Sequence, residues 1–290
     1  METFLHQVFG GIASGVVYAS VALALVMIHR VTRLVNFAQG EMALCSTYFA
    51  AALIDAGLPY WVAFAITLVA SFGMGVLLER VVLRPAMKAP VLSVVIVLIG
   101  LMLVLNSLCG WIFGYTTRAF PSPFSPEPPF GNPYVSSHEL GTVAVTLAML
   151  GLVYAFFRYT SAGLALRAVA DNPESSRLVG IRVERMLALG WGLAAVVGAV
   201  AGILVAPILF LDPSMMGGVM LYAFAAALLG GIDSPLGAVV GGVLVGLVEN
   251  LAGAYLVGTD LKLSTALALI VGTLVLRPQG IFGRPAAARA

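Results

Sequence analysis

Long apolar stretches with few or no charges constrain this chain more than any other feature, and short polar connections separate them. About 20 apolar residues suffice for a helix to cross the hydrocarbon core of a bilayer. Lipid admits helices because their backbone polar groups are satisfied internally. Nine stretches fit this pattern, at residues 8–28, 36–54, 60–78, 91–113, 141–157, 186–210, 215–229, 236–255 and 263–276. The pattern predicts an all-α, polytopic membrane bundle of about eight to nine transmembrane segments, because the seventh and ninth stretches are short.

Composition excludes a soluble domain. Hydrophobic residues make up 61% of the 290 residues and charged residues only 10%, whereas about a quarter of the residues in a soluble domain are charged. The predicted spans occupy most of the chain, so we expect a single transmembrane domain over residues 1–290. Residues 1–7 lack a basic region and a cleavage site, so no removable signal peptide is predicted.

The placement of basic residues predicts the orientation. If the N-terminus lies outside and the spans alternate, thirteen of the fifteen Lys and Arg residues fall on the cytoplasmic side, and only Arg118 and Lys262 fall outside. Basic residues near span ends resist translocation, so we predict an external N-terminus and a cytoplasmic C-terminus. This orientation makes the charged run 158–185 a cytoplasmic loop and the proline-rich run 114–140 an external one, extended and without regular secondary structure.

The cytoplasmic run contains two predicted short helices. Asn172 can cap a helix whose first position is Pro173, and Glu174 and Arg177 then lie at the ends that the helix dipole favours. Gly180 supplies the left-handed conformation that ends many helices. Residues 161–170 predict a second helix, which ends before the proline. A helix of two turns is unstable alone in water, so we expect the pair to dock on a partner and to be moved by it.

Polar residues inside the spans are candidates for a solute pathway. Counting about 1.5 Å per residue from the cytoplasmic ends puts Asn106 about 22 Å and Glu249 about 20 Å along their spans. We therefore predict that Asn106, Glu249 and Asn250 face an interior cavity. The alternative is an interhelical hydrogen bond that holds the bundle together without touching the solute.

The second span begins with polar residues near its predicted cytoplasmic end. Gln39 and Glu41 could line an inner gate there; alternatively, they belong to a helix N-terminus that Asn36 caps. The same counting of residues separates Cys45 and Cys109 by about 14 Å in depth, too far for a disulfide. Both cysteines are predicted to be small core residues.

Several kinds of chemistry have no support in the sequence. No G-x-x-x-x-G-K-[ST] motif is present, so the chain is not expected to bind or hydrolyse ATP by the P-loop route. The three histidines, at 6, 29 and 138, have no partner at ligand spacing, so neither a metal site nor any other cofactor is predicted. No catalytic set is recognisable, which argues against an enzyme. Glycines spaced as Gly237/Gly241 and Gly242/Gly246 are interpreted as helix packing positions.

Four segments together resemble one family: NFAQGE at 36–41, ERVVLRP at 79–85, RAVADNP at 167–173 and GGIDSPLGA at 230–238. In this order they are similar to branched-chain amino-acid ABC importer permeases of the LivH type. The resemblance implies a permease of the bacterial inner membrane. It also implies a LivM-like second permease, two cytoplasmic ATPases that bind ATP, and a periplasmic or lipid-tethered binding protein as partners.

The resemblance also implies roles for the two cytoplasmic helices. They resemble a coupling loop that enters a groove on the ATPase, with Arg167, Asp171, Asn172, Pro173, Glu174, Arg177 and Gly180 as the coupling residues. ATPase closure would move these helices, and the fifth and sixth spans would transmit the movement. Permeases for urea, short amides or aromatic acids look similar. A rival from another class is a secondary transporter driven by an ion gradient, with Glu41 or Glu249 as proton relay.

Overall fold

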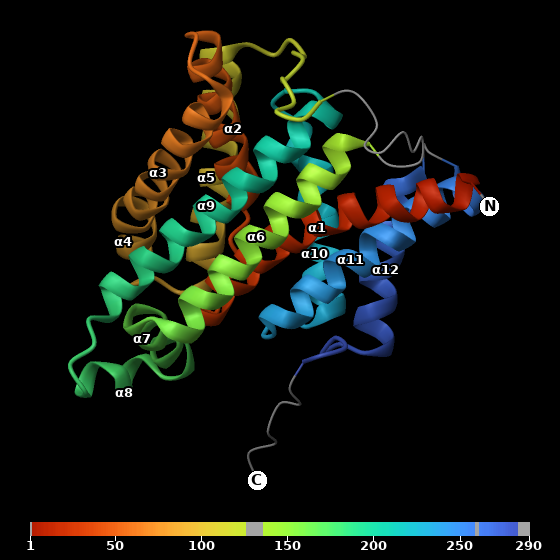
Figure 1. The fold of residues 1–290 in the computed structure, drawn as a ribbon. Helices are drawn as coiled ribbons and strands as arrows, with labels where there is room; N and C mark the ends of the chain where they lie inside the picture. Colours follow the sequence, from red (N-terminus) through yellow and green to blue (C-terminus); the bar gives the residue numbers. More distant parts are fainter. Residues whose placement is uncertain (1, 126–135, 259–260, 284–290) are drawn as a thin grey trace. The chain divides into compact units, whose positions relative to one another are not determined.

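The computed structural model describes residues 2–125, 136–258 and 261–283 (Figure 1). The regular elements of these residues are all helices, which confirms the all-α prediction. They are α1 (Glu2–Thr32), α2 (Gln39–Asp55), α3 (Tyr60–Leu78), η1 (Glu79–Leu83), α4 (Arg84–Ala86), α5 (Val91–Phe113), α6 (Ser137–Tyr159), α7 (Ser161–Asp171), α8 (Pro173–Leu178), α9 (Val183–Leu209), α10 (Met215–Gly230), α11 (Pro235–Ala252), η3 (Gly253–Val257) and α12 (Lys262–Leu276).

The described helices include six that are long and apolar enough to cross a membrane. They are Phe4–Thr32, Tyr60–Ala86, Val91–Phe113, Ser137–Tyr159, Val183–Leu209 and Pro235–Val257. Helices α10 and α12 are apolar but shorter. Large apolar side chains on the outer faces of α3, α5 and α6 are exposed, for example Val69 at 75%, Leu92 at 72% and Leu152 at 72%. Such surfaces suit a lipid environment, and the chain is a multi-pass membrane protein.

The chain divides into two compact units. The first comprises Met1–Val26, Phe124–Ala144 and Gly218–Ala290, and the second comprises Met27–Pro123 and Val145–Gly217. Below, the units are called unit 1 and unit 2 in that order. Three of the four unit boundaries fall inside helices α1, α6 and α10, and the fourth, between Pro123 and Phe124, falls between α5 and α6.

Unit 2 is built around α9, which packs against both α2 and α3. Glycines allow this close approach: a Cβ at Gly75 of α3 would lie 2.5 Å from the carbonyl oxygen of Trp191. On the α2 side, a Cβ at Gly198 would lie 2.6 Å from the side-chain nitrogen of Gln39, and one at Gly202 would overlap Thr47. Small residues therefore let the backbones of three helices meet, as expected for association in lipid.

In unit 1, glycines allow the same close packing between α1 and α11. A Cβ at Gly15 would lie 2.8 Å from the Cα of Val243, and Cβ atoms at Gly242 and Gly246 would overlap the backbone of α1. The packing role predicted for Gly242 and Gly246 is confirmed.

We expect Gly246→Leu to destabilise unit 1 by about 1–3 kcal/mol or more, because overpacking forces two backbones apart. The measurement is thermal unfolding of the purified chain in mild detergent. Gly272→Leu on α12 is the matched control, because nothing lies within 4 Å of a Cβ at that position. An unchanged unfolding temperature for Gly246→Leu would contradict the packing described here.

Three sequence predictions about connections need correction. The predicted external loop 114–140 is too long, because α6 begins at Ser137; residues 126–135 of that loop lie outside the described residues. In its described part, the backbone of Arg118 pairs with that of Leu211 in an isolated antiparallel bridge. The sixth span was predicted to be broken or kinked at Pro207, and α9 continues through that residue to Leu209, so the helix is not broken there. Residues 79–90 were predicted to be a basic connection closed by prolines, whereas they are helical as far as Ala86.

Candidate functional site

The two predicted cytoplasmic helices are present as α7 and α8, at one end of α6 and α9 (Figure 1). The side chain of Asn172 caps α8 by accepting a hydrogen bond from the backbone N–H of Ser175 at 3.0 Å, and Pro173 occupies the first helical position. Gly180 has a φ of +86° and follows the end of the helix. Thr160 caps α7 in the same way, through the N–H of Gly163 at 3.0 Å. The predicted start and stop signals are confirmed.

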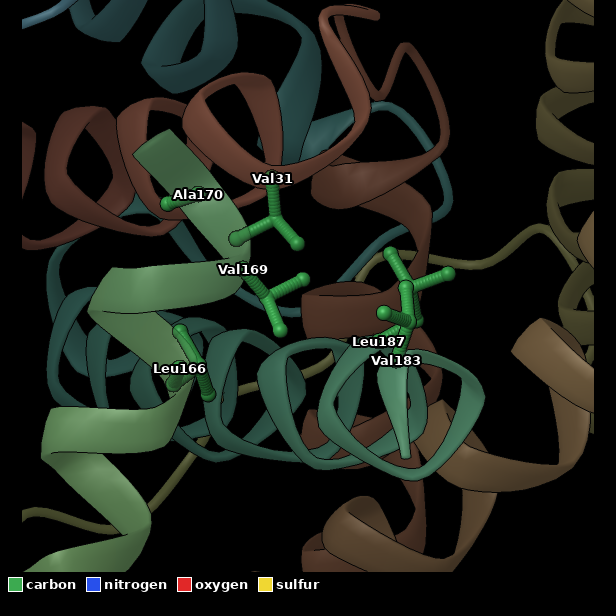
Figure 2. Packing of buried hydrophobic residues seen from close by; sticks show 6 residues of the cluster. All are labelled: Val31, Leu166, Val169, Ala170, Val183 and Leu187. Atoms are coloured by element: carbon green, nitrogen blue, oxygen red, sulfur yellow. The ribbon is translucent and has the colours of Figure 1, made fainter. Parts of the chain in front are cut away.

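One face of α7 is buried in a hydrophobic cluster of unit 2. Leu166, Val169 and Ala170 follow the i, i+3, i+4 spacing of an amphipathic helix face. Figure 2 shows the cluster, which consists of Val31 at the end of α1, Leu166, Val169 and Ala170 of α7, and Val183 and Leu187 of α9. Val169 is fully buried. Burying a side chain of this size contributes about 1.5–3 kcal/mol, so α7 is held firmly against α1 and α9.

The polar coupling residues surround this buried face. Asp171 lies 3.7 Å from the guanidinium of Arg30 on α1, and the Asp171 side chain is 75% exposed. An exposed ion pair of this kind contributes at most about 1 kcal/mol. Glu174 and Arg177 are exposed on α8, and Arg167 is half-buried on α7. The structure thus brings the predicted coupling residues together on one pair of helices.

Sequence reasoning missed two apolar residues at the end of α8. Leu178 is 88% exposed and Val179 is 76% exposed. They lie at the C-terminal end of α8, where the other exposed side chains are mainly polar, so they form an apolar tip to the coupling helices. The signal was available, because two apolar residues directly precede Gly180 in a run otherwise expected in water.

An ion pair that follows α3, between a buried carboxylate and a partly exposed guanidinium, was also missed. Glu79 is fully buried, and its carboxylate accepts hydrogen bonds from Arg84, at 3.2 Å from Nε and 2.8 Å from a terminal nitrogen. Arg84 also donates to the backbone carbonyl of Glu184 at 3.2 Å, which ties this turn to the start of α9. Residues five apart meet because η1 is a π-helix, whose hydrogen bonds join residues i and i+5. The pattern ERVVLRP at 79–85 indicated a family resemblance but not this ion pair.

Helix α2 starts deep inside unit 2, which corrects the predicted depth of Gln39 and Glu41. Along the parallel helices α2 and α5, the side chains that meet are 64 or 65 positions apart: Glu41 contacts Asn106, and Cys45 contacts Cys109. If the two spans began at the same depth, at residues 36 and 91, the side chains that meet would be 55 positions apart in the sequence. The prediction was therefore wrong by about ten residues, or about 15 Å along the helix axis.

The error arises from the connection between α1 and α2. Residues 33–38 are not helical, and Arg33 has a φ of +58°. This segment leads to the first residue of α2, Gln39, which is fully buried and donates from Nε2 to the carbonyl oxygen of Ala194 at 2.9 Å. Non-helical backbone at such a depth is tolerated only where protein surrounds it. Asn36 is also buried and does not cap α2: its Oδ1 accepts from the N–H of Ala38.

Glu41 and Asn106 form a polar cluster in unit 2. The amide nitrogen of Asn106 donates to the Glu41 carboxylate at 3.0 Å and to the carbonyl oxygen of Pro213 at 2.7 Å. The cluster joins α2, α5 and the segment before α10 within an otherwise apolar bundle. Such groups are expensive in a membrane and are by default candidates for a solute path.

A second polar cluster lies in unit 1. Glu249 of α11 is 7% exposed. Its carboxylate accepts a hydrogen bond from the hydroxyl of Tyr18 at 2.8 Å. The rings of Tyr18 and Tyr222 stack with centroids 4.8 Å apart. Next to Glu249, the Asn250 side chain accepts from the ammonium of Lys262 at 3.1 Å.

Both clusters make hydrogen bonds between helices. The alternative prediction, in which these residues hold the bundle together without touching the solute, requires such bonds as well. Asn106 lies in unit 2, whereas Glu249 and Asn250 lie in unit 1. A common cavity lined by all three residues therefore stays a prediction. Among the described residues, no three His, Cys, Asp or Glu side chains are grouped so that they could hold a metal ion.

Comparison with known proteins connects this geometry to a family. A family model described as "Branched-chain amino acid transport system / permease component" matches residues 7–276. The chain is 33% identical over 300 residues to the high-affinity branched-chain amino acid transport system permease protein LivH of Escherichia coli K12, covering 97% of this chain and 96% of that protein. It is 30% identical over 298 residues to BraD of Pseudomonas aeruginosa, with the same coverage. A probable LivH of Methanocaldococcus jannaschii is 27% identical over 278 residues, which are 90% of this chain and 87% of that protein.

Proposed function

Because this chain belongs to the branched-chain amino acid transport permease family, we propose that it forms the membrane pathway of an ABC importer for branched-chain amino acids. It is a transport subunit of the inner membrane and not an enzyme. The proposed partners are a LivM-like second permease, two cytoplasmic ATPases that bind the ATP, and a periplasmic or lipid-tethered binding protein.

We also propose the topology that the basic residues favour, with eight or nine spans, the N-terminus outside and the C-terminus in the cytoplasm. The six long apolar helices account for most of these spans. Helices α2, α10 and α12, at 15–17 residues, are shorter than a full crossing. A helix that begins inside the bundle, as α2 does, need not cross the whole membrane.

The observation that carries the proposal is the way in which α7 and α8 pack against the rest of the chain. The buried face of α7 packs on α1 and α9, while the apolar tip of Leu178 and Val179 at the end of α8 stays exposed. A short pair of helices that is packed against the bundle on one side and exposed on the other can transmit force from a docked partner. We propose that the partner is the ATPase and that Arg167, Asp171, Asn172, Pro173, Glu174, Arg177 and Gly180 support the docking.

The route of the movement follows from the contacts of α7. The expected transmitters were the fifth and sixth spans, which are α6 and α9. The hydrophobic cluster adds the end of α1 through Val31. From there the chain passes through residues 33–38 to Gln39 and Glu41 at the buried start of α2. A displacement of α7 would therefore reach the Glu41–Asn106 contact through a short stretch of chain.

We propose Gln39, Glu41, Asn106, Glu249 and Asn250 as pathway residues. The two clusters offer a carboxylate, hydroxyls, amides and an ammonium within apolar surroundings. An amino acid carries an ammonium, which a carboxylate binds, and a carboxylate, which an amide N–H, a hydroxyl or an ammonium binds. Each cluster taken alone offers both kinds of group. The apolar remainder of the bundle suits a branched aliphatic side chain.

One observation favours a second candidate from another class. The buried, interrupted entrance to α2 is similar to the broken helices of secondary transporters, in which Glu41 or Glu249 would relay protons. The energy source separates the candidates. In vesicles that contain the assembled complex and binding protein, we expect leucine uptake to survive collapse of the ion gradient and to stop without ATP on the ATPase side.

The converse result, in which uptake needs the gradient and not ATP, would establish the secondary transporter instead. The same vesicles test the substrate class. Excess isoleucine or valine is expected to compete with labelled leucine, whereas urea, short amides and aromatic acids are not. Competition by one of these three classes would assign the chain to the related importers.

A further inference from the structure

The chain's two cysteines meet on the seam between α2 and α5. The sulfur atoms of Cys45 and Cys109 lie 2.8 Å apart, and both are free thiols. The sequence prediction of a 14 Å separation in depth was wrong for the same reason as the predicted depth of Glu41: α2 starts deeper than the count assumed. Cys45 is partly exposed, whereas Cys109 is 3% exposed.

The seam holds the two sulfurs in register. The Glu41–Asn106 contact lies one helical turn on one side of the pair, and the stacked rings of Tyr48 and Phe113, with centroids 4.8 Å apart, lie about one turn on the other side. Both helices are continuous through this region. The cysteines are therefore presented to each other by two rigid elements with contacts above and below.

We propose that Cys45 and Cys109 form a reversible disulfide that staples α2 to α5. A disulfide has an S–S length of about 2.05 Å, so the sulfurs need to approach by less than about 1 Å.

The oxidant is an external disulfide, and the reaction is thiol–disulfide exchange. The thiolate of Cys45, the more exposed of the two, attacks one sulfur of the external disulfide and releases one small thiol. The thiolate of Cys109 then attacks the sulfur of Cys45 and releases the second thiol. Two protein thiols lose two electrons and two protons, and the external disulfide is reduced to two thiols. In the proposed topology, this end of the seam faces the outer side, where conditions are oxidising.

The staple would hold Glu41 against Asn106. If transport requires these two residues to part, which rests on the pathway proposed above, oxidation stops transport and reduction restores it. The site would then make uptake sensitive to the redox state outside the cell.

The test uses the assembled transporter in vesicles treated with dithiodipyridine, a permeant aromatic disulfide. Mass spectrometry of the digested chain is expected to show a peptide that links Cys45 to Cys109, and leucine uptake is expected to fall at least tenfold and to recover with dithiothreitol. Cys45→Ser and Cys109→Ser are the controls, because neither can form the link and both should keep uptake in the presence of the oxidant.

Two results would overturn the proposal. If Cys45 retains a pyridyl mixed disulfide and no linked peptide forms, the sulfurs cannot reach each other. If the link forms fully and uptake is unchanged, the staple does not control transport. The linked peptide is detected without any transport assay, so failure of the proposed substrate would be seen separately, as absent uptake in untreated vesicles.

Discussion

The double substitution Leu178→Ala with Val179→Ala is expected to weaken binding of the ATPase about thirty-fold. Truncating an apolar side chain that is buried in an interface costs about 1 kcal/mol, and the sum for two such residues, about 2 kcal/mol, corresponds to about thirty-fold in affinity. Both side chains are largely exposed in this chain, at 88% and 76%. Their removal therefore leaves the core of the permease intact. Binding of the purified ATPase to the permease pair in detergent measures the effect.

A matched control separates docking from general surface effects. Leu236 at the start of α11 is also apolar and 70% exposed, and in the proposed topology it too lies on the cytoplasmic side. Leu236→Ala is expected to bind the ATPase as the parent chain does. Equal affinity for the parent and the double variant would show that the apolar tip is not part of the docking surface.

The substitution Asn106→Ala is expected to lower leucine uptake at least tenfold while the complex still assembles. It removes the amide that bonds both Glu41 and the Pro213 carbonyl. Losing one hydrogen bond to a charged group costs about 1.5–3 kcal/mol, which exceeds the 1.4 kcal/mol that corresponds to tenfold. Uptake into vesicles, with assembly checked by copurification, is the measurement. Ser107→Ala, at the exposed neighbouring position on α5, is the control.

Glu249→Gln tests whether the polar cluster of unit 1 is also needed for uptake. A glutamine side chain can still accept the hydrogen bond from Tyr18, so the fold is preserved while the charge is removed. Reduced uptake is expected here too. Normal uptake in both Asn106→Ala and Glu249→Gln would leave the two clusters with a structural role alone.

Local chemistry made several parts of this fold predictable. The bounds of α3 and α5 match the predicted spans, since Pro59 and Pro90 directly precede them and a helix begins readily after proline. The cap at Asn172 and the stop at Gly180 follow from backbone preferences that act over a few residues. Glycine spacing predicted close packing correctly, because small residues are what allow helices to approach in lipid.

The depth at which α2 begins within the bundle could not be predicted in the same way. The sequence shows that residues 36–54 are apolar overall, but not that residues 33–38 run into the bundle before α2 begins. Tertiary burial of Asn36 and Gln39 decides that point, and no local preference reports it. One shift of about ten residues accounts for the misplaced Glu41, the separated cysteines and the missed Glu41–Asn106 contact. The Glu79–Arg84 pair was missed because it depends on a π-helical turn.

The central claim is that force enters this chain through α7 and α8 from a cytoplasmic ATPase, and labelling at Ser175 tests it most directly. Ser175 is exposed on α8, so Ser175→Cys, in a chain that also carries Cys45→Ser and Cys109→Ser, presents a single thiol there. An impermeant maleimide is expected to react with it from the cytoplasmic side only, and bound ATPase is expected to block the reaction. Labelling from the outside of intact cells would place α8 on the wrong side of the membrane and contradict the account.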